Sequence, residues 1–363
     1  MSLTIRGGLS PLIMIVIILA AMVTFLALVM ATKIITGEEN IIYYHHEIAV
    51  MMVAVLLLWL LKQPVLAYLD FTILGIGIFL VCGRVGCLMV GCCHGRPNNW
   101  GVCYRPEHAD AGFTYYYVGI RLLPIQAIES LWVLCVVIVG VMLILNGYPP
   151  GAALAWYVMA YDVGRFCFEF ARGDPERPYL WGFSQGQWLS VALMFFVMIV
   201  GLYGALPFYS WHAWVTSCLL LVMTAVAVRR RLAPGAKHRL LNPIHVREVA
   251  SVVENVSALT TEIPPAYRLV ELSGQTYIAT ELHLGCTSLG VQISASEIGS
   301  AADRTLHYAL SYRDGDMPEE AARIIAGLIL QLRQSTEYGE LLRGTEDVFH
   351  LLIHPLARKA LTQ

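Results

Sequence analysis

Two arginines of this 363-residue chain stand where a hydrocarbon environment is expected. Arg84 follows the apolar run Phe-Leu-Val-Cys-Gly, and Arg165 lies within Tyr-Asp-Val-Gly-Arg-Phe-Cys-Phe-Glu. A charge near the centre of a bilayer costs from about 3 to over 10 kcal/mol, so it persists only where it faces a cavity, a partner or an anionic ligand. Two planar guanidiniums that converge on one pocket suit a phosphate, because each binds its oxygens in a bidentate manner. In a membrane that phosphate belongs to a phospholipid head group.

Tyrosine, glutamate and a further arginine recur at helical spacing around Arg165. Tyr161 lies four residues before it, Glu169 four after it and Arg172 three beyond that, so the four are predicted to share one helix face. The alternative is that Arg165 and Glu169 form an ion pair that only joins two helices. Because Arg84 and Arg165 together exceed what one structural pair requires, we favour the phosphate pocket.

Weaker polar groups stand at the starts of other apolar segments. His45 and His46 open one of them, and a histidine suits a general base because its ordinary pKa is near 6.5. Gln126 and Glu129 lie at the start of another, and Gln187 at the start of a third. Polar residues are also ordinary at helix ends near a membrane interface, so each of these groups alone is a weak signal.

Four of the nine cysteines cluster shortly after Arg84, namely Cys87, Cys92, Cys93 and Cys103. The arginine is one helical turn before Cys87 and would lower the pKa of that thiol, which is then either a reactive thiolate or a buried inert side chain. Adjacent cysteines rarely both ligate one tetrahedral ion, and the spacing is not a zinc-finger pattern. We therefore expect no metal and no other cofactor, and keep a thiol-redox or metal protein as a third alternative.

The composition predicts that membrane helices position these residues. The chain is 57% hydrophobic and 14% charged, whereas an average soluble protein is about 25% charged. Apolar runs of about 20 residues can each cross a bilayer. The first is too long for a signal peptide and lacks a small-residue cleavage site, so we expect a retained helix. We predict about seven spans, at residues 10–32, 44–62, 66–91, 124–146, 151–171, 187–205 and 207–228.

A change of composition near residue 229 predicts the end of the membrane part. The basic run Arg229–Arg231 and the Leu-Ala-Pro-Gly-Ala-Lys after it are typical of a membrane exit and a linker, and the positive-inside rule places this end in the cytoplasm. The fold class that we predict is an all-α polytopic membrane protein with a C-terminal soluble α+β domain. Its parts are a transmembrane domain over 1–229, a basic linker over 230–239 and a cytoplasmic domain over 240–363.

Two local patterns support the α+β assignment. Residues 267–284 are rich in strand-forming side chains around a short Ser273-Gly-Gln turn, which predicts a β-hairpin. Asp316 and Glu319 have the spacing of a helix capping box. Apolar residues then follow at helical spacing, namely Ile324, Ile325, Leu328, Ile329 and Leu332.

The order of the membrane motifs resembles the bacterial prolipoprotein diacylglyceryl transferase family. The resemblance covers roughly residues 40 to 205 and does not extend beyond 229, and four motifs in order make it specific. The matching segments are Gly83-Arg84-Val-Gly86 through Gly95-Arg96 with Trp100-Gly-Val102, then Pro124-Ile-Gln126-Ala-Ile-Glu129, then Tyr161 through Arg172, and finally Ser184-Gln-Gly186-Gln187-Trp-Leu-Ser190.

The resemblance implies a seven-helix enzyme of the bacterial cytoplasmic (inner) membrane. Such an enzyme transfers the diacylglyceryl group of phosphatidylglycerol to a lipobox cysteine and releases glycerol 1-phosphate. Arg84 and Arg165 match the family's phosphate-holding arginines, and His45 or His46 matches a histidine that helps the thiol lose its proton. The positions implied to contact substrate are Tyr161, Gln126, Glu129, Glu169, Gly95, Arg172, Gln187 and Cys87.

The chain also departs from the family pattern. Cys87, Val90 and Cys92 stand where the family has two asparagines and a glutamate. Because polar contacts are lost while both arginines remain, we expect the same phospholipid with a changed acceptor or altered chemistry. The acceptor would be a lipobox-type peptide or another thiol. The alternative is a non-catalytic phospholipid-binding scaffold whose cytoplasmic domain recruits a protein partner. We expect no nucleic-acid partner.

Overall fold

The chain forms two compact units in the computed structural model. The first, called the membrane unit here, comprises Met1–Gly86, Ala127–Phe170 and Tyr179–Thr224. The second, called the mixed unit, comprises Cys87–Gln126, Ala171–Pro178 and Ala225–Gln363. The structure describes residues 8–36, 43–174, 179–232, 239–262, 267–272, 275–280, 283–298, 305–333, 338–344 and 348–354.

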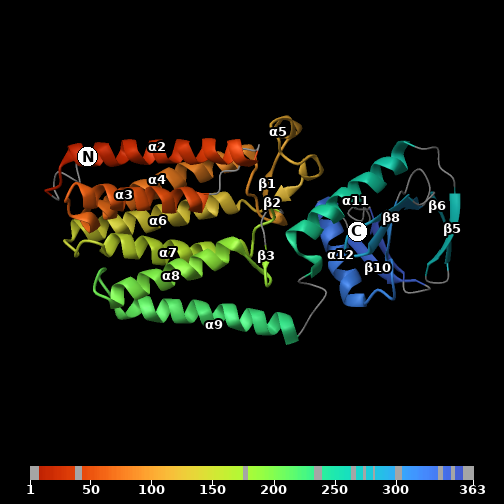
Figure 1. Cartoon of the computed structure of the whole chain (residues 1–363). Coiled ribbons are helices and arrows are strands. Elements are labelled where there is room, and N and C mark those ends of the chain that lie inside the picture. Colours follow the sequence, from red (N-terminus) through yellow and green to blue (C-terminus); the bar gives the residue numbers. More distant parts are fainter. Residues whose placement is uncertain are drawn as a thin grey trace, which may run out of the picture. The chain divides into compact units, whose positions relative to one another are not determined.

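Each of the predicted spans coincides with a helix in the described part of the chain (Figure 1). Five of these helices, α2, α4, α6, α8 and α9, are long and apolar enough to cross a membrane. α3 is a shorter apolar helix, and α7 carries Asp162, Arg165 and Glu169 in its second half. The helical membrane fold is confirmed, whereas the count of about seven spans is not, because five of the described helices meet the length and hydropathy of a span. The bounds are α2 (Pro11–Thr36), α3 (Tyr43–Leu60), α4 (Val65–Val90), α6 (Ile125–Leu145), α7 (Ala152–Glu169), α8 (Gln185–Leu202) and α9 (Ser210–Leu232).

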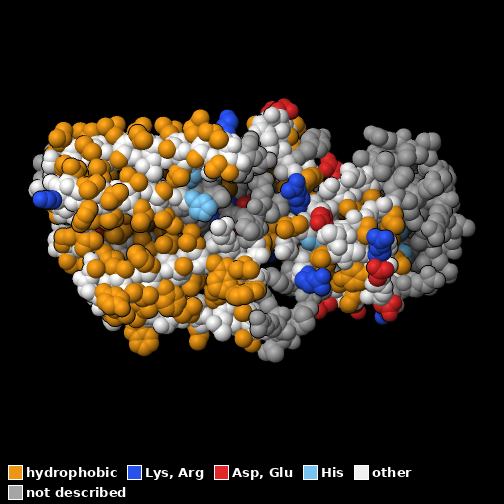
Figure 2. All heavy atoms as spheres, in the orientation of Figure 1, with side chains coloured by type: hydrophobic (Ala, Val, Ile, Leu, Met, Phe, Trp, Pro, Cys, Tyr) orange, Lys and Arg blue, Asp and Glu red, His pale blue; other side chains and the backbone are white. Residues whose placement is uncertain are grey.

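Large hydrophobic side chains face outward on the helices of the membrane unit. Leu19 is 56% exposed, Phe196 61% and Leu221 72%. Figure 2 shows hydrophobic side chains over most of the visible face of these helices. Soluble proteins rarely leave such contiguous apolar surface in water, so this surface fits a lipid environment.

A buried carboxylate holds the start of α7 in place. Asp70 of α4 accepts hydrogen bonds from the backbone N–H groups of Gly151 and Leu154, both at 2.7 Å. The first N–H groups of a helix have no partner within the helix, so Asp70 caps α7 from a neighbouring helix. This contact fixes the helix whose other end carries Arg165 and Glu169.

An antiparallel sheet forms the centre of the mixed unit. Its strand order is β10-β11-β9-β8-β6-β5, with β7 also paired to β8. β5 and β6 pair in antiparallel register, with Leu272 opposite Gln275, which confirms the predicted hairpin. Its turn, 273–274, lies outside the described residues, as does most of the predicted linker. The strands are β5 (Tyr267–Leu272), β6 (Gln275–Thr280), β7 (His283–Cys286), β8 (Val291–Ile298), β9 (Thr305–Tyr312), β10 (Tyr338–Arg343) and β11 (Phe349–His354).

Two helices, α11 (Pro243–Glu262) and α12 (Glu319–Arg333), contribute to the core of the mixed unit. The apolar residues predicted for α12 are inside, with Ile325 and Ile329 fully buried. The predicted capping box is wrong. The helix begins at Glu319, whose carboxylate instead accepts from Arg323 Nε at 2.9 Å. The α+β class of this part of the chain is confirmed.

The segment between α4 and α6 belongs to the same core as the sheet. It contains β1 (Pro97–Cys103), α5 (Pro106–Asp110), the short helix η1 (Tyr115–Tyr117) and β2 (Arg121–Leu122). Its buried aromatic residues, Tyr104, Phe113 and Tyr117, lie in one hydrophobic cluster with residues of α11, α12 and the sheet.

Two further short strands, β3 (Tyr179–Leu180) and β4 (Phe183–Ser184), precede α8.

Candidate active site

Arg84 of α4 and Arg165 of α7 both contact Glu129 of α6. Nη2 of Arg84 donates to Oε1 of Glu129 at 2.9 Å, and Nη1 of Arg165 donates to Oε1 and Oε2 at 3.1 and 3.3 Å. Nη2 of Arg165 lies 2.7 Å from Oε1 of Glu169. All four side chains are buried. They form a continuous series, Arg84–Glu129–Arg165–Glu169, which we call the ion chain. Its two positive and two negative groups balance.

Helical spacing and close packing bring these groups together. Tyr161, Arg165 and Glu169 follow one another at four-residue intervals on α7, and the Tyr161 hydroxyl lies 3.5 Å from Oε1 of Glu129. Gly164 lets α7 approach α6, because a Cβ there would lie 2.2 Å from Nε1 of Trp132. The structure therefore places two of the four residues predicted for this face, Tyr161 and Arg165, beside the Glu129 carboxylate. Glu169, the third, pairs with Arg165 instead.

Arg172, the fourth residue predicted for that face, lies elsewhere. α7 ends at Glu169, and the backbone of Arg172 pairs with that of Gly95 in the mixed unit. Its Nε donates to Oδ1 of Asp174 at 2.8 Å, and its Nη2 donates to Oδ2 at 3.2 Å. The predicted helix was too long because the backbone pairing with Gly95 and the ion pair with Asp174 replace a further turn. Gly95 itself donates its N–H to the Leu123 carbonyl at 2.9 Å.

Gln126 and Cys87 also lie in the mixed unit. Nε2 of Gln126 donates to the backbone carbonyl of Cys92 at 2.7 Å, so this amide holds the loop that follows α4. The Cys87 thiol lies in a group with those of Cys92 and Cys93.

Gln187 helps to start α8. Ser184 and Gln187 form a capping box: Oε1 of Gln187 accepts from the Ser184 N–H at 3.0 Å, and the Ser184 hydroxyl accepts from the Gln187 N–H at 3.2 Å. Nε2 of Gln187 donates to the Phe166 carbonyl at 3.3 Å, one residue after Arg165. Gln187 thus joins α8 to the part of α7 that carries the ion chain.

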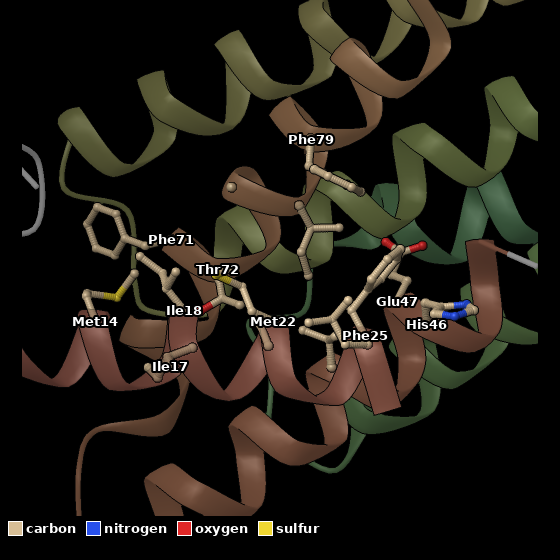
Figure 3. Close-up of a pocket in the computed structure, with 15 residues that line it drawn as sticks. Met14, Ile17, Ile18, Met22, Phe25, His46, Glu47, Phe71, Thr72 and Phe79 are labelled. Atoms are coloured by element: carbon tan, nitrogen blue, oxygen red, sulfur yellow. The ribbon is translucent and has the colours of Figure 1, made fainter. Parts of the chain in front are cut away.

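The two candidate histidines differ in environment. His45 is exposed, whereas His46 is 4% exposed and its ring lies 4.8 Å from that of Phe25. His46 and Glu47 line a cavity of about 570 Å³ among α2, α3 and α4. Figure 3 shows them at the end of the cavity away from Met14 and Phe71. The rest of the lining is almost entirely apolar, and the ion-chain arginines are not part of it.

Two acidic residues near these sites, Glu47 and Asp162, were not among the site residues predicted from the sequence. Asp162 of α7 is 1% exposed and interacts electrostatically with both Glu47 and Arg165. Its carboxyl group therefore lies within electrostatic range of both the polar end of the cavity and the ion chain. The signal that could have found both acids is their position in apolar segments, where an ionisable side chain indicates function by default.

This arrangement can bind and stabilise an anion. A guanidinium presents five N–H donors in a planar fork whose geometry matches the oxygens of a phosphate. In a buried site, these donors interact with a phosphate more strongly than they would in water. The adjacent cavity offers an apolar environment of a size typical of ligand pockets.

Comparisons with known proteins match this part of the chain. The family model described as prolipoprotein diacylglyceryl transferase matches residues 12–203. A phosphatidylglycerol–prolipoprotein diacylglyceryl transferase 2 of Clostridium perfringens is 28% identical over 146 residues, which are 39% of this chain and 52% of that protein. The corresponding transferase of Clostridium tetani is 28% identical over 141 residues, 38% of this chain and 52% of the relative. That of Dehalococcoides mccartyi is 28% identical over 126 residues, 35% of this chain and 46% of the relative.

The chain spans about half the length of the curated relatives it matches. No solved structure matches it. The family match includes α2, α4, α6, α7 and α8, and therefore every member of the ion chain. Since the model covers more than half of the sequence, the chain belongs to the prolipoprotein diacylglyceryl transferase family.

Proposed function

We propose that this protein transfers a diacylglyceryl group from phosphatidylglycerol to a thiol. The observation that carries the proposal is the convergence of Arg84 and Arg165, from separate helices, on the single buried carboxylate of Glu129. Two guanidiniums in one apolar site suit the phosphate of a lipid head group. The names of the relatives support the same substrate.

The reaction would proceed by attack of the acceptor sulfur on the carbon of the diacylglyceryl group that is bonded to the phosphate oxygen. A carbon–sulfur bond forms, the carbon–oxygen bond breaks, and glycerol 1-phosphate leaves with the electron pair. Arg84 and Arg165 would stabilise the charge that develops on the leaving phosphate, which is the kind of electrostatic effect that usually contributes most to catalysis. His46 is our candidate for the base that accepts the thiol proton.

The cavity beside His46 supports a lipid substrate. It has a volume of about 570 Å³ and an almost entirely apolar lining, with Glu47 and His46 at one end. An acyl chain would lie against Ile17, Phe71 and their neighbours, which places the glycerol near the polar end. Asp162 lies within electrostatic range of both Glu47, at this end, and Arg165.

The setting and the acceptor are part of the proposal. We place the protein in the bacterial cytoplasmic membrane, with the C-terminal part of the mixed unit in the cytoplasm, where it would contact a protein partner. The acceptor is a lipobox-type peptide or another thiol, because Cys87 and Cys92 replace polar residues of the family pattern.

The test is turnover by the full chain in phosphatidylglycerol vesicles. A lipobox peptide is added, and mass spectrometry follows glycerol phosphate release and the peptide mass, with a cysteine-to-serine peptide as control. Arg84→Ala should abolish release. Arg121→Ala, which changes an exposed arginine of β2, should leave it unchanged. Release that is equal in wild type and Arg84→Ala would refute the phosphate site.

A second candidate function is a non-catalytic phospholipid-binding scaffold. The observation in its favour is the balance of the ion chain, since two glutamates neutralise two arginines without any ligand. A scaffold would retain phosphatidylglycerol through purification, release no glycerol phosphate with any thiol offered, and lose the lipid only partly in Arg84→Ala. Transfer to a thiol other than the lipobox peptide would exclude it.

A further inference from the structure

Three cysteine thiols meet at the point where α4 ends and the chain turns towards β1. The Sγ atoms of Cys87, Cys92 and Cys93 all lie within 4.8 Å of one another. Cys92 is exposed and the other two are half-buried. The proposed transfer reaction uses none of these thiols.

The backbone explains how two adjacent cysteines can both face the third. Neighbouring side chains diverge by about 100° on a helix and point to opposite faces of a strand, so such a pair rarely serves one ion. Here α4 ends at Val90, Gly91 has φ of +88°, and Cys93 has φ of +56°. The left-handed turn brings both thiols back towards Cys87 in the last turn of the helix. A left-handed conformation at a non-glycine residue is uncommon and often marks a functional site.

Hydrogen bonds hold this turn from several sides. Gly91 N–H donates to the Cys87 carbonyl at 2.9 Å, and Gln126 Nε2 donates to the Cys92 carbonyl at 2.7 Å. The carbonyl of His94 accepts from the Gly173 N–H at 3.0 Å. The thiols therefore stand on a supported backbone, which is the condition for a preorganised metal site.

The separation of the sulfurs fits a zinc ion. Zn–S bonds of about 2.3 Å at tetrahedral angles place two sulfurs about 3.8 Å apart. The cluster needs a contraction of at most about 1 Å to reach that spacing, which small side-chain rotations supply. Thiolates are soft ligands that select Zn²⁺ over Mg²⁺ and Ca²⁺.

We propose that Cys87, Cys92 and Cys93 bind one Zn²⁺ as three thiolates, with a fourth position open to water or to another thiol. Binding releases the three thiol protons to solvent and involves no change of oxidation state. His94 is not proposed as the fourth ligand, because the ligand atoms that lie within 4.8 Å of one another belong to the three cysteines alone among the described residues. Three protein ligands with one open position are the pattern of reactive zinc sites rather than of closed structural ones.

The experiment is zinc binding by the full-length protein in detergent. The chain is reduced, stripped with a chelator and titrated with Zn²⁺ alone, while bound metal and the number of alkylated cysteines are measured. We expect one zinc per chain and three fewer reactive thiols. Cys92→Ser and Cys87→Ser should each weaken binding at least tenfold. Cys103→Ser removes an exposed thiol of β1 outside the cluster and should bind as wild type does.

Cys93→Gly provides a second and sharper variant. Glycine adopts the left-handed conformation without a steric penalty, so this change should leave the thermal unfolding temperature equal or higher while zinc binding is lost. Wild-type affinity in Cys92→Ser or Cys93→Gly would overturn the proposal. So would a disulfide among the three cysteines that forms in the presence of excess zinc. The assay contains no lipid substrate or acceptor, so its result is independent of whether the chain transfers a diacylglyceryl group.

Discussion

The ion chain of the membrane unit and a buried histidine pair in the sheet of the mixed unit satisfy their polar groups in opposite ways. In the membrane unit the buried groups of the ion chain carry charge, and each guanidinium is within 3.1 Å of a carboxylate oxygen. In the sheet of the mixed unit a buried network consists of Ser296, His307 and His350. Oγ of Ser296 lies 2.7 Å from Nδ1 of His307, and Nε2 of His307 lies 2.8 Å from Nδ1 of His350.

His307 and His350 avoid charge near neutral pH. Burial and the neighbouring His350 lower the pKa of His307 to about 3, and burial also lowers the pKa of His350. Both rings are therefore neutral near pH 7, and hydrogen bonds suffice to satisfy them.

The difference indicates where the chemistry lies. A histidine can release its proton on burial, but an arginine cannot, so a buried arginine must be matched by a partner. Replacing a buried ion network by apolar residues is often neutral or stabilising, which makes charge an inefficient way to hold α4, α6 and α7 together. We infer that the ion chain is kept for the anion it binds, whereas the histidine network serves the stability of the sheet.

The largest effect is expected when the shared carboxylate of the ion chain is neutralised. Glu129→Gln leaves Arg84 and Arg165 without the anion that both contact, and breaking a buried ion pair in this way costs about 3–5 kcal/mol. Thermal unfolding in detergent should show a large loss of stability. Glu320→Gln, at an exposed position of α12, should change little. Equal melting of the two variants would mean that the ion chain does not stabilise the membrane unit.

A lysine in place of Arg165 keeps the positive charge but loses the guanidinium, and so tests the role of the ion chain in turnover. Arg165→Lys keeps a cation, but a single ammonium cannot reproduce the contacts of Nη1 with Glu129 and Nη2 with Glu169 while also binding a phosphate. We expect glycerol phosphate release to fall by about 100-fold, equivalent to about 2.7 kcal/mol. Arg121→Lys is the matched control. If Arg165→Lys retained full turnover, positive charge alone would explain the site.

Lowering the pH should destabilise the mixed unit through its histidines. Their pKa values are lower in the folded state than the ordinary value near 6.5, so the unfolded chain binds protons that the folded chain excludes. The stabilisation is complete above about pH 6.5 and is lost as the pH falls towards 3, at up to about 1.4 kcal/mol per pH unit for each histidine. Hydrogen exchange of β9 and β11, corrected for intrinsic rates, measures this dependence.

Matched variants separate the titration of the buried histidines from a general change in the stability of the sheet. His307→Gln should reduce the slope of stability against pH by about one histidine's contribution. Ser311→Ala, which removes a hydrogen bond of β9 to Gln292 but no titratable group, should leave the slope unchanged. A slope that stays the same in His307→Gln would assign the pH dependence to other groups.

The regular helices of the membrane unit could be predicted from the sequence. Hydrophobic runs set the positions of the helices, and four-residue spacing correctly placed Tyr161, Arg165 and Glu169 on one face. Contacts between distant segments could not be read in this way. Glu129 was a weak signal at a helix entrance, yet it is the carboxylate at which α4, α6 and α7 meet.

Irregular backbone conformation was the second reason why parts of the structure could not be predicted from the sequence. The end of α7 at Glu169 depends on the pairing of Arg172 with Gly95, which is 77 residues earlier in the sequence. The convergence of Cys92 and Cys93 depends on a left-handed residue that propensities do not indicate. Spacing rules assume a regular helix or strand, and they fail where the chain leaves one.

The smallest effect is expected at the capping box of α8, where an uncharged contact supports the charged region. Ser184→Ala removes the hydroxyl that accepts from the Gln187 N–H, and the loss of a cap costs about 1 kcal/mol. Gln187 also donates to the Phe166 carbonyl beside Arg165, so its looser placement should lower turnover a few-fold. Ser184→Thr restores a capping hydroxyl and should recover both stability and turnover. If Ser184→Ala lowered turnover as strongly as Arg165→Lys, the capping box would have to take a direct part in binding the substrate.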